Sequence, residues 1–361
     1  MSRVPIERDV PLAGRTTLGL GGSARHFARA TEDAHVLQAV RHAADRGMPL
    51  ALLGGGSNTI VPDEGFRGLV LSMETSGHAL MPLDDGRVAL RVKAGTPWPS
   101  VVSASVAQGL AGLECLAGIP GSTGATPVQN VGAYGQEVAD TLLTVRALDR
   151  STLDEVTFTR EACEFAYRDS VFKRDPHRYV VLEVTFALTR GGPPAVRYAE
   201  LERAITALVP EGQPTLQQVH DTVVALRRAK GMVLDPDDVD THSAGSFFTN
   251  PIVSEVQATQ VRERAVAAGV VSAGSELPSW PESGGRVKLA AGWLIERAGV
   301  TKGLRRGHVG VSSKHALALV HHGGGTTAEL LALADEVAAR VEAAFGVTLQ
   351  REPQLLAGVR A

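Results

Sequence analysis

Apolar residues recur at helical spacing in several stretches of this chain. In residues 31–46, Ala34, Leu37, Val40 and Ala44 would share one helix face, with Thr31 as the predicted N-cap. Thr326 and Glu329 form a capping-box pattern ahead of another such stretch. The same spacing predicts further helices over 98–108, 199–208, 216–229, 253–268, 288–298 and 327–344.

Short apolar runs between these stretches predict strands. They are bounded by glycine, proline or polar residues, as strands usually are. The runs lie at 49–53, 68–73, 88–94, 142–148, 155–158, 179–188, 316–320 and 348–356. In the first half the strands cluster instead of alternating evenly with helices, which favours an α+β fold. Residues 190–194, Arg-Gly-Gly-Pro-Pro, are predicted to be a connector.

Composition narrows the function classes. A chain of 361 residues has room for two or three domains, and its formal net charge of −3 gives no global electrostatic case for nucleic acid. No apolar run approaches the roughly 18 residues needed to span a bilayer, and residues 1–20 lack the apolar core of a signal peptide. We therefore expect a cytoplasmic protein without membrane insertion.

Cysteine and histidine show no metal-ligand spacing, so no metal site is predicted. Cys115 and Cys163 lie far apart in segments of different kinds and are expected to be buried, reduced thiols. His321 and His322 are adjacent and cannot share a strand face. His308 is taken as a structural or surface residue.

Two glycine-rich segments carry the first functional signal. Gly54-Gly55-Gly56-Ser57-Asn58 follows a predicted buried strand, and the run Gly118–Gly135 holds five glycines, two prolines and no charge. Glycines let backbone N–H groups approach a phosphate closely, although a structural tight turn would also explain the first segment. Neither a P-loop ending nor Rossmann glycine spacing is present. Two such loops in one α+β unit imply a long ligand such as a dinucleotide.

The motifs resemble those of the UDP-N-acetylenolpyruvoylglucosamine reductases. The resemblance rests first on Gly54–Asn58, Gly118–Ser122 and Pro127–Gly135. It continues, in the family's order and over nearly the whole chain, through Tyr167-Arg168-Asp169-Ser170, Gly245-Ser246-Phe247-Phe248, Ala290–Ile295 and Glu352-Pro353.

This resemblance implies a fold and an activity. Residues 1–190 would form a PCMH-type flavin-binding domain of two α+β subdomains, 210–345 a smaller C-terminal α/β substrate domain, and 346–361 a final strand returning to the active-site cleft. FAD would be bound non-covalently and NADPH would be the hydride donor. The product would be UDP-N-acetylmuramate, made from UDP-N-acetylglucosamine enolpyruvate for peptidoglycan. The partners would be small molecules only, and the protein a monomer.

The resemblance also assigns residues. Ser246 would be the proton donor, while Arg168 and Glu352 would stabilise charge on the substrate carboxylate. Tyr198, Lys230, Asn250 and Lys288 would bind substrate, with Lys230 also a candidate to support Ser246. The cofactor would contact Gly54, Gly55, Gly56, Ser57, Asn58, Gly118, Ile119, Pro120, Gly121, Ser122, Gly124, Gln129, Asn130, Gly132, Ala133 and Tyr134.

Local sequence leaves other interpretations open. Arg168 could pair with Asp169 or Glu164 on the surface, Ser246 could be a turn hydroxyl, and Glu352 could pair with Arg351 in solvent. Tyr198, Asn250 and Lys288 have equally good structural explanations. Thr249 stands where the family pattern has a basic residue, so one cationic contact differs here. A flavin oxidase acting on a small alcohol, or a nucleotide-binding module without catalysis, are the alternative functions.

Overall fold

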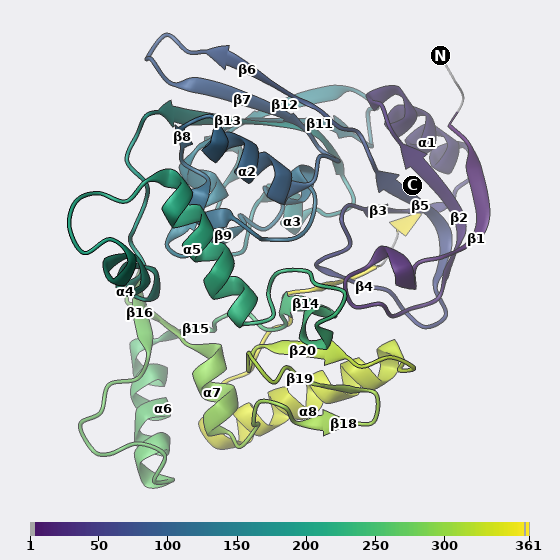
Figure 1. Cartoon of the computed structure of the whole chain (residues 1–361). Coiled ribbons are helices and arrows are strands. Elements are labelled where there is room, and N and C mark those ends of the chain that lie inside the picture. Colours follow the sequence, from purple (N-terminus) through teal and green to yellow (C-terminus); the bar gives the residue numbers. More distant parts are fainter. Residues whose placement is uncertain (1–3, 357–358, 361) are drawn as a thin grey trace.

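The computed structural model describes residues 4–356 and 359–360 and divides into three regions (Figure 1). The first region is built on a sheet whose central strands β2, β5 and β3 run parallel. Strand β5 is buried at nearly every position, as expected for a parallel strand covered on both faces. The elements are β1 (Ile6–Pro11), β2 (Ser23–Ala30), α1 (Asp33–Asp45), β3 (Pro49–Leu53), β5 (Phe66–Met73) and β22 (Val359–Arg360).

The second region is an antiparallel sheet in the order β12-β11-β13-β7-β6. Trp98 and Phe186 pack with ring centroids 5.6 Å apart and anchor helix α2 to this sheet. Helices α4 and α5 contribute Leu201 and Val219 to the same core. The elements are β6 (His78–Pro82), β7 (Val88–Lys93), α2 (Trp98–Ala107), β8 (Leu110–Ala111), β11 (Leu142–Asp149), β12 (Glu155–Thr159), α3 (Val171–Arg174), β13 (Tyr179–Arg190), α4 (Ala199–Leu208) and α5 (Leu216–Ala229).

The third region has its own hydrophobic core, to which helix α8 contributes most. Strands β14, β20, β19 and β18 form one sheet, and β15, β17 and β16 form another. The elements are β14 (Ser243–Ser246), β15 (Ile252–Ser254), α6 (Glu255–Ala267), β16 (Ser279–Glu282), β17 (Arg286–Leu289), α7 (Ala291–Arg297), β18 (Arg305–Arg306), β19 (Val309–Val311), β20 (Ala318–His321) and α8 (Thr327–Phe345). The domain limits given by the resemblance stay a prediction.

Most predicted elements are confirmed, with displaced starts. Helix α1 begins after Glu32, and Thr31 does not cap it. The helices expected from 253 and 288 begin later, because Ile252–Ser254 pairs with Arg286–Leu289 as strands β15 and β17. Strands β1, β2 and β6 were not predicted from the sequence. The apolar residues of β1 and β2 are interrupted by charged ones, and β6 is a short strand that is exposed at most positions.

The predicted strand at 348–356 is wrong. Arg351 makes only an isolated bridge to Phe248, and Gln354–Leu355 (β21) pairs in parallel with Thr59–Ile60 (β4). Glu352 lies between these two contacts in irregular backbone, and its N–H donates to the Phe247 carbonyl over 2.9 Å. The C-terminal segment therefore connects the third region to the first region beside Asn58.

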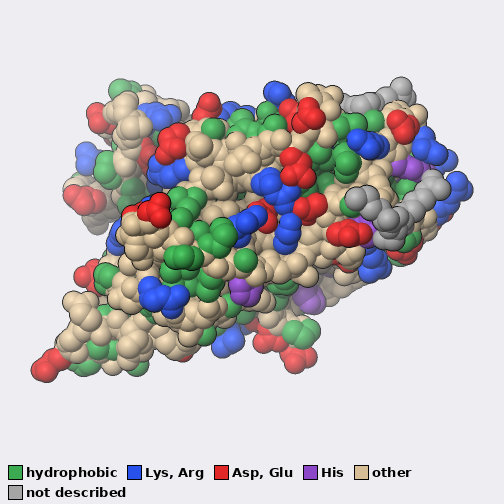
Figure 2. Space-filling view, turned by 90° about the horizontal axis from the view of Figure 1, so that it is seen from above, with side chains coloured by type: hydrophobic (Ala, Val, Ile, Leu, Met, Phe, Trp, Pro, Cys, Tyr) green, Lys and Arg blue, Asp and Glu red, His purple; other side chains and the backbone are tan. Residues whose placement is uncertain are grey.

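The mixed charge of the surface and the state of the two cysteines are as the sequence indicates. Figure 2 shows acidic and basic side chains interspersed over the face it presents. Cys115 and Cys163 are free and buried, and burial raises the pKa of each thiol to about 12. No helix within the described residues combines the length and apolarity that a bilayer crossing requires.

Helix α8 generates a test of how the regions are joined. Asp63, in the first region, accepts hydrogen bonds from the Thr327 and Ala328 N–H groups over 2.7 and 2.9 Å. These are two of the donors that a helix N-terminus leaves unpaired. We expect Asp63→Ala to lower the free energy of unfolding by about 1 kcal/mol, measured by urea titration. Asp84→Ala, at an exposed position, is the control and should change it little.

Candidate active site

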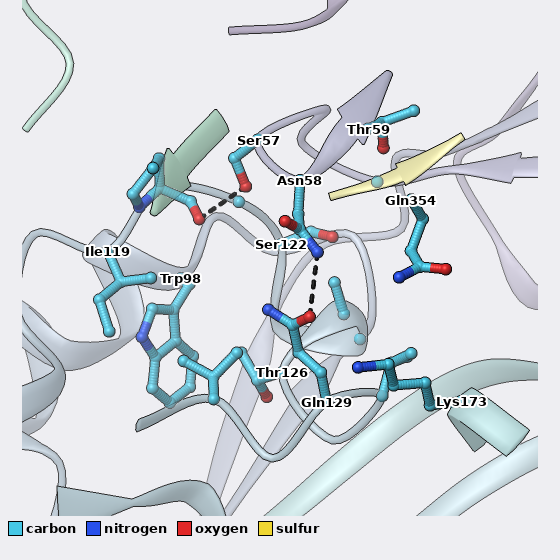
Figure 3. Close-up of a pocket in the computed structure, with 18 of the residues that line it drawn as sticks. Ser57, Asn58, Thr59, Trp98, Ile119, Ser122, Thr126, Gln129, Lys173 and Gln354 are labelled. Atoms are coloured by element: carbon cyan, nitrogen blue, oxygen red, sulfur yellow. Dashed lines mark hydrogen bonds between the residues drawn. The ribbon is translucent and has the colours of Figure 1, made fainter. Parts of the chain in front are cut away.

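A cavity of about 400 Å³ lies where the three regions meet. The two glycine-rich loops, the turn before α3, strand β14 and the C-terminal segment all contribute to its wall. Figure 3 labels residues of both loops together with Lys173 and Gln354. Ten of the predicted cofactor-contacting residues line it, namely Gly54, Ser57, Asn58, Ile119, Pro120, Gly121, Ser122, Gly124, Gln129 and Gly132.

The two glycine-rich loops pack directly against each other, with glycines where they meet. A Cβ on Gly55 would lie 2.6 Å from Gly121 Cα, and one on Gly54 would lie 2.4 Å from Ser122 Oγ. The Ser57 hydroxyl donates to the Pro120 carbonyl over 2.9 Å. Asn58 Nδ2 donates to Gln129 Oε1 over 3.0 Å, as drawn in Figure 3. Glycine at position 55 is thus required for the two loop backbones to lie this close.

The other predicted cofactor contacts, Gly55, Gly56, Gly118, Asn130, Ala133 and Tyr134, do not line this cavity. Asn130 is 1% exposed and has a left-handed φ of 45°. Its amide donates to Glu137 and to the Ala166 carbonyl, and its oxygen accepts from the Ala139 N–H. The structure therefore places Asn130 as a brace between the second loop and the Tyr167–Ser170 turn.

Arg168, Ser246 and Glu352 line the cavity together. Arg168 Nε lies 3.0 Å from Glu352 Oε1, and the two side chains are 19% and 12% exposed. Arg168 Nη2 donates to the Gly132 carbonyl over 2.9 Å. The solvated pairings that local sequence left open, with Asp169 or Glu164 and with Arg351, are not made. Arg174 pairs with Asp169 and Glu164, and Arg351 with Asp335.

The backbone of Arg168 is unusual. Its φ of 53° lies in the left-handed region, which costs a residue with a Cβ roughly 1–2 kcal/mol. Ser170, on the following turn, caps α3 and donates to the Val128 carbonyl over 2.6 Å. The fold thus holds the arginine in a conformation that the isolated chain would avoid.

Glu352 has a perturbed environment. Burial raises its pKa above the ordinary value, and Arg168, Lys173 and the Gln129 amide oppose that shift only in part. The ordinary pKa of a glutamate is ~4.3, so a raised value lets a protonated carboxyl persist closer to neutral pH. The Ser246 hydroxyl has no hydrogen-bond partner among residues 4–356 and 359–360, so it is free to meet a ligand.

The predicted substrate-binding residues lie outside this cavity. Lys230 pairs with Glu200 over 2.6 Å and lies 5.6 Å from the Tyr134 ring centroid, while Tyr134 packs edge-on against Tyr198. The expectation that Lys230 supports Ser246 stays a prediction. Lys288 pairs with Glu282 and lies 4.6 Å from the Tyr167 ring centroid.

A second cavity of about 530 Å³ lies against the first. Arg168 and Lys173 belong to the walls of both. Asn250 lines it, with its side-chain oxygen accepting from the Ala291 N–H, and so does Thr249. The family's basic residue at position 249 would therefore have faced this second cavity.

Sequence reasoning missed Lys173, Arg227 and Gln354, which all line the main cavity. Arg227 lies on α5, where nothing but helical periodicity marks it. Its Nε is buried without a partner, and burial lowers its pKa to about 10. Its Nη2 donates to the Met232 carbonyl over 3.0 Å, so the buried Nε is the part of the guanidinium that is suited to meet an anionic group of a ligand.

The chemistry of the wall fits a long anionic ligand with a flat apolar part. The glycine cradle and the orphaned Arg227 nitrogen suit phosphate or other anionic oxygens. Apolar side chains, among them Trp98, Val128 and Phe172, line the same cavity. Within the part of the chain that the structure describes, no cluster of three or more His, Cys, Asp or Glu side chains that could hold a metal ion occurs.

Comparison with known proteins shows two matching protein families and relatives that align over nearly the whole chain. Residues 24–152 match the FAD binding domain family, and residues 236–356 match the family described as UDP-N-acetylenolpyruvoylglucosamine reductase, C-terminal domain. The UDP-N-acetylenolpyruvoylglucosamine reductase of Streptomyces avermitilis is 50% identical over 351 residues, covering 96% of this chain and 93% of the relative. That of Thermobifida fusca is 49% identical, covering 97% of each.

The fold likewise has a solved counterpart. The crystal structure of UDP-N-acetylenolpyruvylglucosamine reductase from Thermus caldophilus aligns with a TM-score of 0.63 at 24% identity. The alignment covers 98% of this chain and all of the other.

The pKa of His315 is lowered in the folded protein, so the pH dependence of stability can be used to test its environment. Burial, then the positive charges of Lys230, Lys302 and Arg227, lower its pKa to about 4 from an ordinary 6.5. The folded protein thus binds this proton less readily than the unfolded chain, so stability falls as pH drops from 6.5 toward 4. We expect His315→Gln to lose less unfolding free energy than the wild type across that window. The control, exposed His78→Gln, should follow the wild type.

Proposed function

This chain belongs to the UDP-N-acetylenolpyruvoylglucosamine reductase family, and from that premise we propose how its own residues perform the family's reaction. It is an FAD-containing enzyme that uses NADPH to reduce UDP-N-acetylglucosamine enolpyruvate to UDP-N-acetylmuramate for peptidoglycan synthesis. The observation that supports the residue roles is that Arg168, Ser246 and Glu352 share one cavity with both glycine-rich loops.

The cavity wall fits FAD. Residues Gly54–Asn58 would hold the pyrophosphate on backbone N–H groups, and the loop Gly118–Gly135 would follow the rest of the molecule. The buried Arg227 Nε, which has no partner among the described residues, would donate to one of the anionic oxygens of FAD. When bound, FAD would supply the redox chemistry by which NADPH reduces the enolpyruvyl double bond.

The chain's own residues would control charge and protons. Arg168 presents a planar guanidinium to the substrate carboxylate, where negative charge grows as the double bond is reduced. Glu352, with its raised pKa, would act as a protonated carboxyl on the same group. Ser246, whose hydroxyl is unengaged, would donate a proton to the carbon next to the carboxylate.

Tyr198, Lys230, Asn250 and Lys288 would contact the nucleotide and sugar of the substrate. In the structure Lys230 and Lys288 are each paired with a glutamate, so binding an anionic diphosphate would exchange those carboxylates for phosphate oxygens. The monomeric state and the cytoplasmic location stay predictions.

A two-step assay separates the two half-reactions. NADPH should bleach the flavin under anaerobic conditions, and UDP-N-acetylglucosamine enolpyruvate should then restore its colour. We expect Ser246→Ala to leave bleaching nearly intact and to slow recolouring by ~100-fold or more, because only the second step needs the proton. Equal loss of both steps would reject the proton-donor role.

The same assay decides between functions. Reduction of the flavin by a simple alcohol instead of NADPH would favour an oxidase. A colourless protein that binds nucleotide would favour a non-catalytic module.

The loop contact predicts a cofactor-retention defect. A methyl group on Gly55 would collide with the Gly121 backbone and separate the loops. Gly55→Ala should therefore weaken FAD binding by about 10-fold or more, measured as flavin fluorescence released on dilution. Gly14→Ala is the matched control, because nothing lies within 4 Å of a Cβ there. Wild-type retention in Gly55→Ala would contradict the loop assignment.

A further inference from the structure

Lys173 is a charged residue of the main cavity to which neither sequence motif nor family assignment gives a role. Its ammonium donates to the carbonyl of Arg168 over 2.7 Å. Within residues 4–356 and 359–360 that carbonyl is its only hydrogen-bond partner, so two of its three N–H donors remain unengaged.

This hydrogen bond adds to the contacts that hold Arg168 in its left-handed backbone conformation. Arg168 has its left-handed φ of 53°, Ala166 and Asp169 bridge across the turn, and Ser170 fixes the far end on Val128. Lys173 reaches back from helix α3 to the Arg168 carbonyl itself. The direction of the Arg168 side chain follows from this backbone conformation, so the lysine helps to aim the guanidinium at Glu352.

Charge gives Lys173 a second effect. The groups around Glu352 are the Arg168 guanidinium from the turn, the Lys173 ammonium from α3, and the uncharged Gln129 and Asn58 from the loops. Lys173 is thus the second cation that favours the carboxylate form of Glu352.

We infer that Lys173 is a positioning residue for the proposed reaction, holding Arg168 in its left-handed conformation and supplying a second positive charge at the Glu352 end of the cavity. The inference rests on the roles proposed for Arg168 and Glu352. It differs from a purely structural role because it predicts a change in the titration of Glu352.

Three variants of Lys173 separate the two effects in the FAD-loaded protein. K173M removes donor and charge, K173Q keeps a donor without charge, and K173R keeps both. R174M is the matched control, because it removes a cation from the adjacent position of α3 that faces Asp169 and Glu164 instead of the cavity.

The direct readout is the protonation of Glu352. Infrared difference spectra against E352Q, taken across pH, isolate the band of its protonated carboxyl. Removing a nearby cation disfavours the carboxylate, so the midpoint should rise by about half a pH unit or more in K173M and K173Q. It should stay near the wild-type value in K173R and R174M.

The kinetic readout is the rate of recolouring by UDP-N-acetylglucosamine enolpyruvate. K173M should slow it by ~10-fold or more, with bleaching by NADPH little changed, because a displaced guanidinium no longer meets the carboxylate. K173Q should slow it less than K173M. Should K173M fail to retain FAD, the contrast between K173Q and K173R in the infrared midpoint decides the question.

An unchanged midpoint in both K173M and K173Q, or an equal shift in R174M, would overturn the inference. Failure of the roles proposed for Arg168 and Glu352 would give a different result. Wild-type turnover in R168K and E352Q would reject the proposed roles while leaving the infrared shift in place.

Discussion

The ion pair between Arg168 and Glu352 is the interaction on which the active site depends. It joins a turn of the second region to the C-terminal segment, which packs against the first and third, so all three regions must be in place for it to form. Both side chains are largely buried, where breaking such a pair by removing one partner costs roughly 3–5 kcal/mol. The pair therefore couples assembly of the fold to assembly of the site.

Neither partner is held by secondary structure alone. Arg168 occupies a left-handed conformation fixed by Ser170, Lys173 and the carbonyl of Gly132. Glu352 lies in irregular backbone between its bond to Phe247 and the short β21–β4 ladder. Strain and burial of this kind persist only where the surroundings over-determine them, which is typical of functional sites.

The sequence correctly predicted the elements that depend on the regular spacing of apolar residues. Helices α4 and α5 have the predicted bounds, and the capping box of α8 forms. These features depend on residues that lie close together in the chain, so a local sequence pattern predicts them. Strand β1 could not be predicted, since it depends on pairing with β2 and not on its own apolar content. For the same reason Glu352 was misplaced on a strand. Arg227 and Lys173 were missed because only the folded chain brings them to the cavity.

A crystal structure with FAD and UDP-N-acetylglucosamine enolpyruvate bound is the direct test of these residue roles. The substrate carboxylate should contact Arg168 and Glu352, and Ser246 Oγ should lie against the adjacent carbon. A carboxylate bound elsewhere, with Ser246 out of contact with the substrate, would contradict these roles.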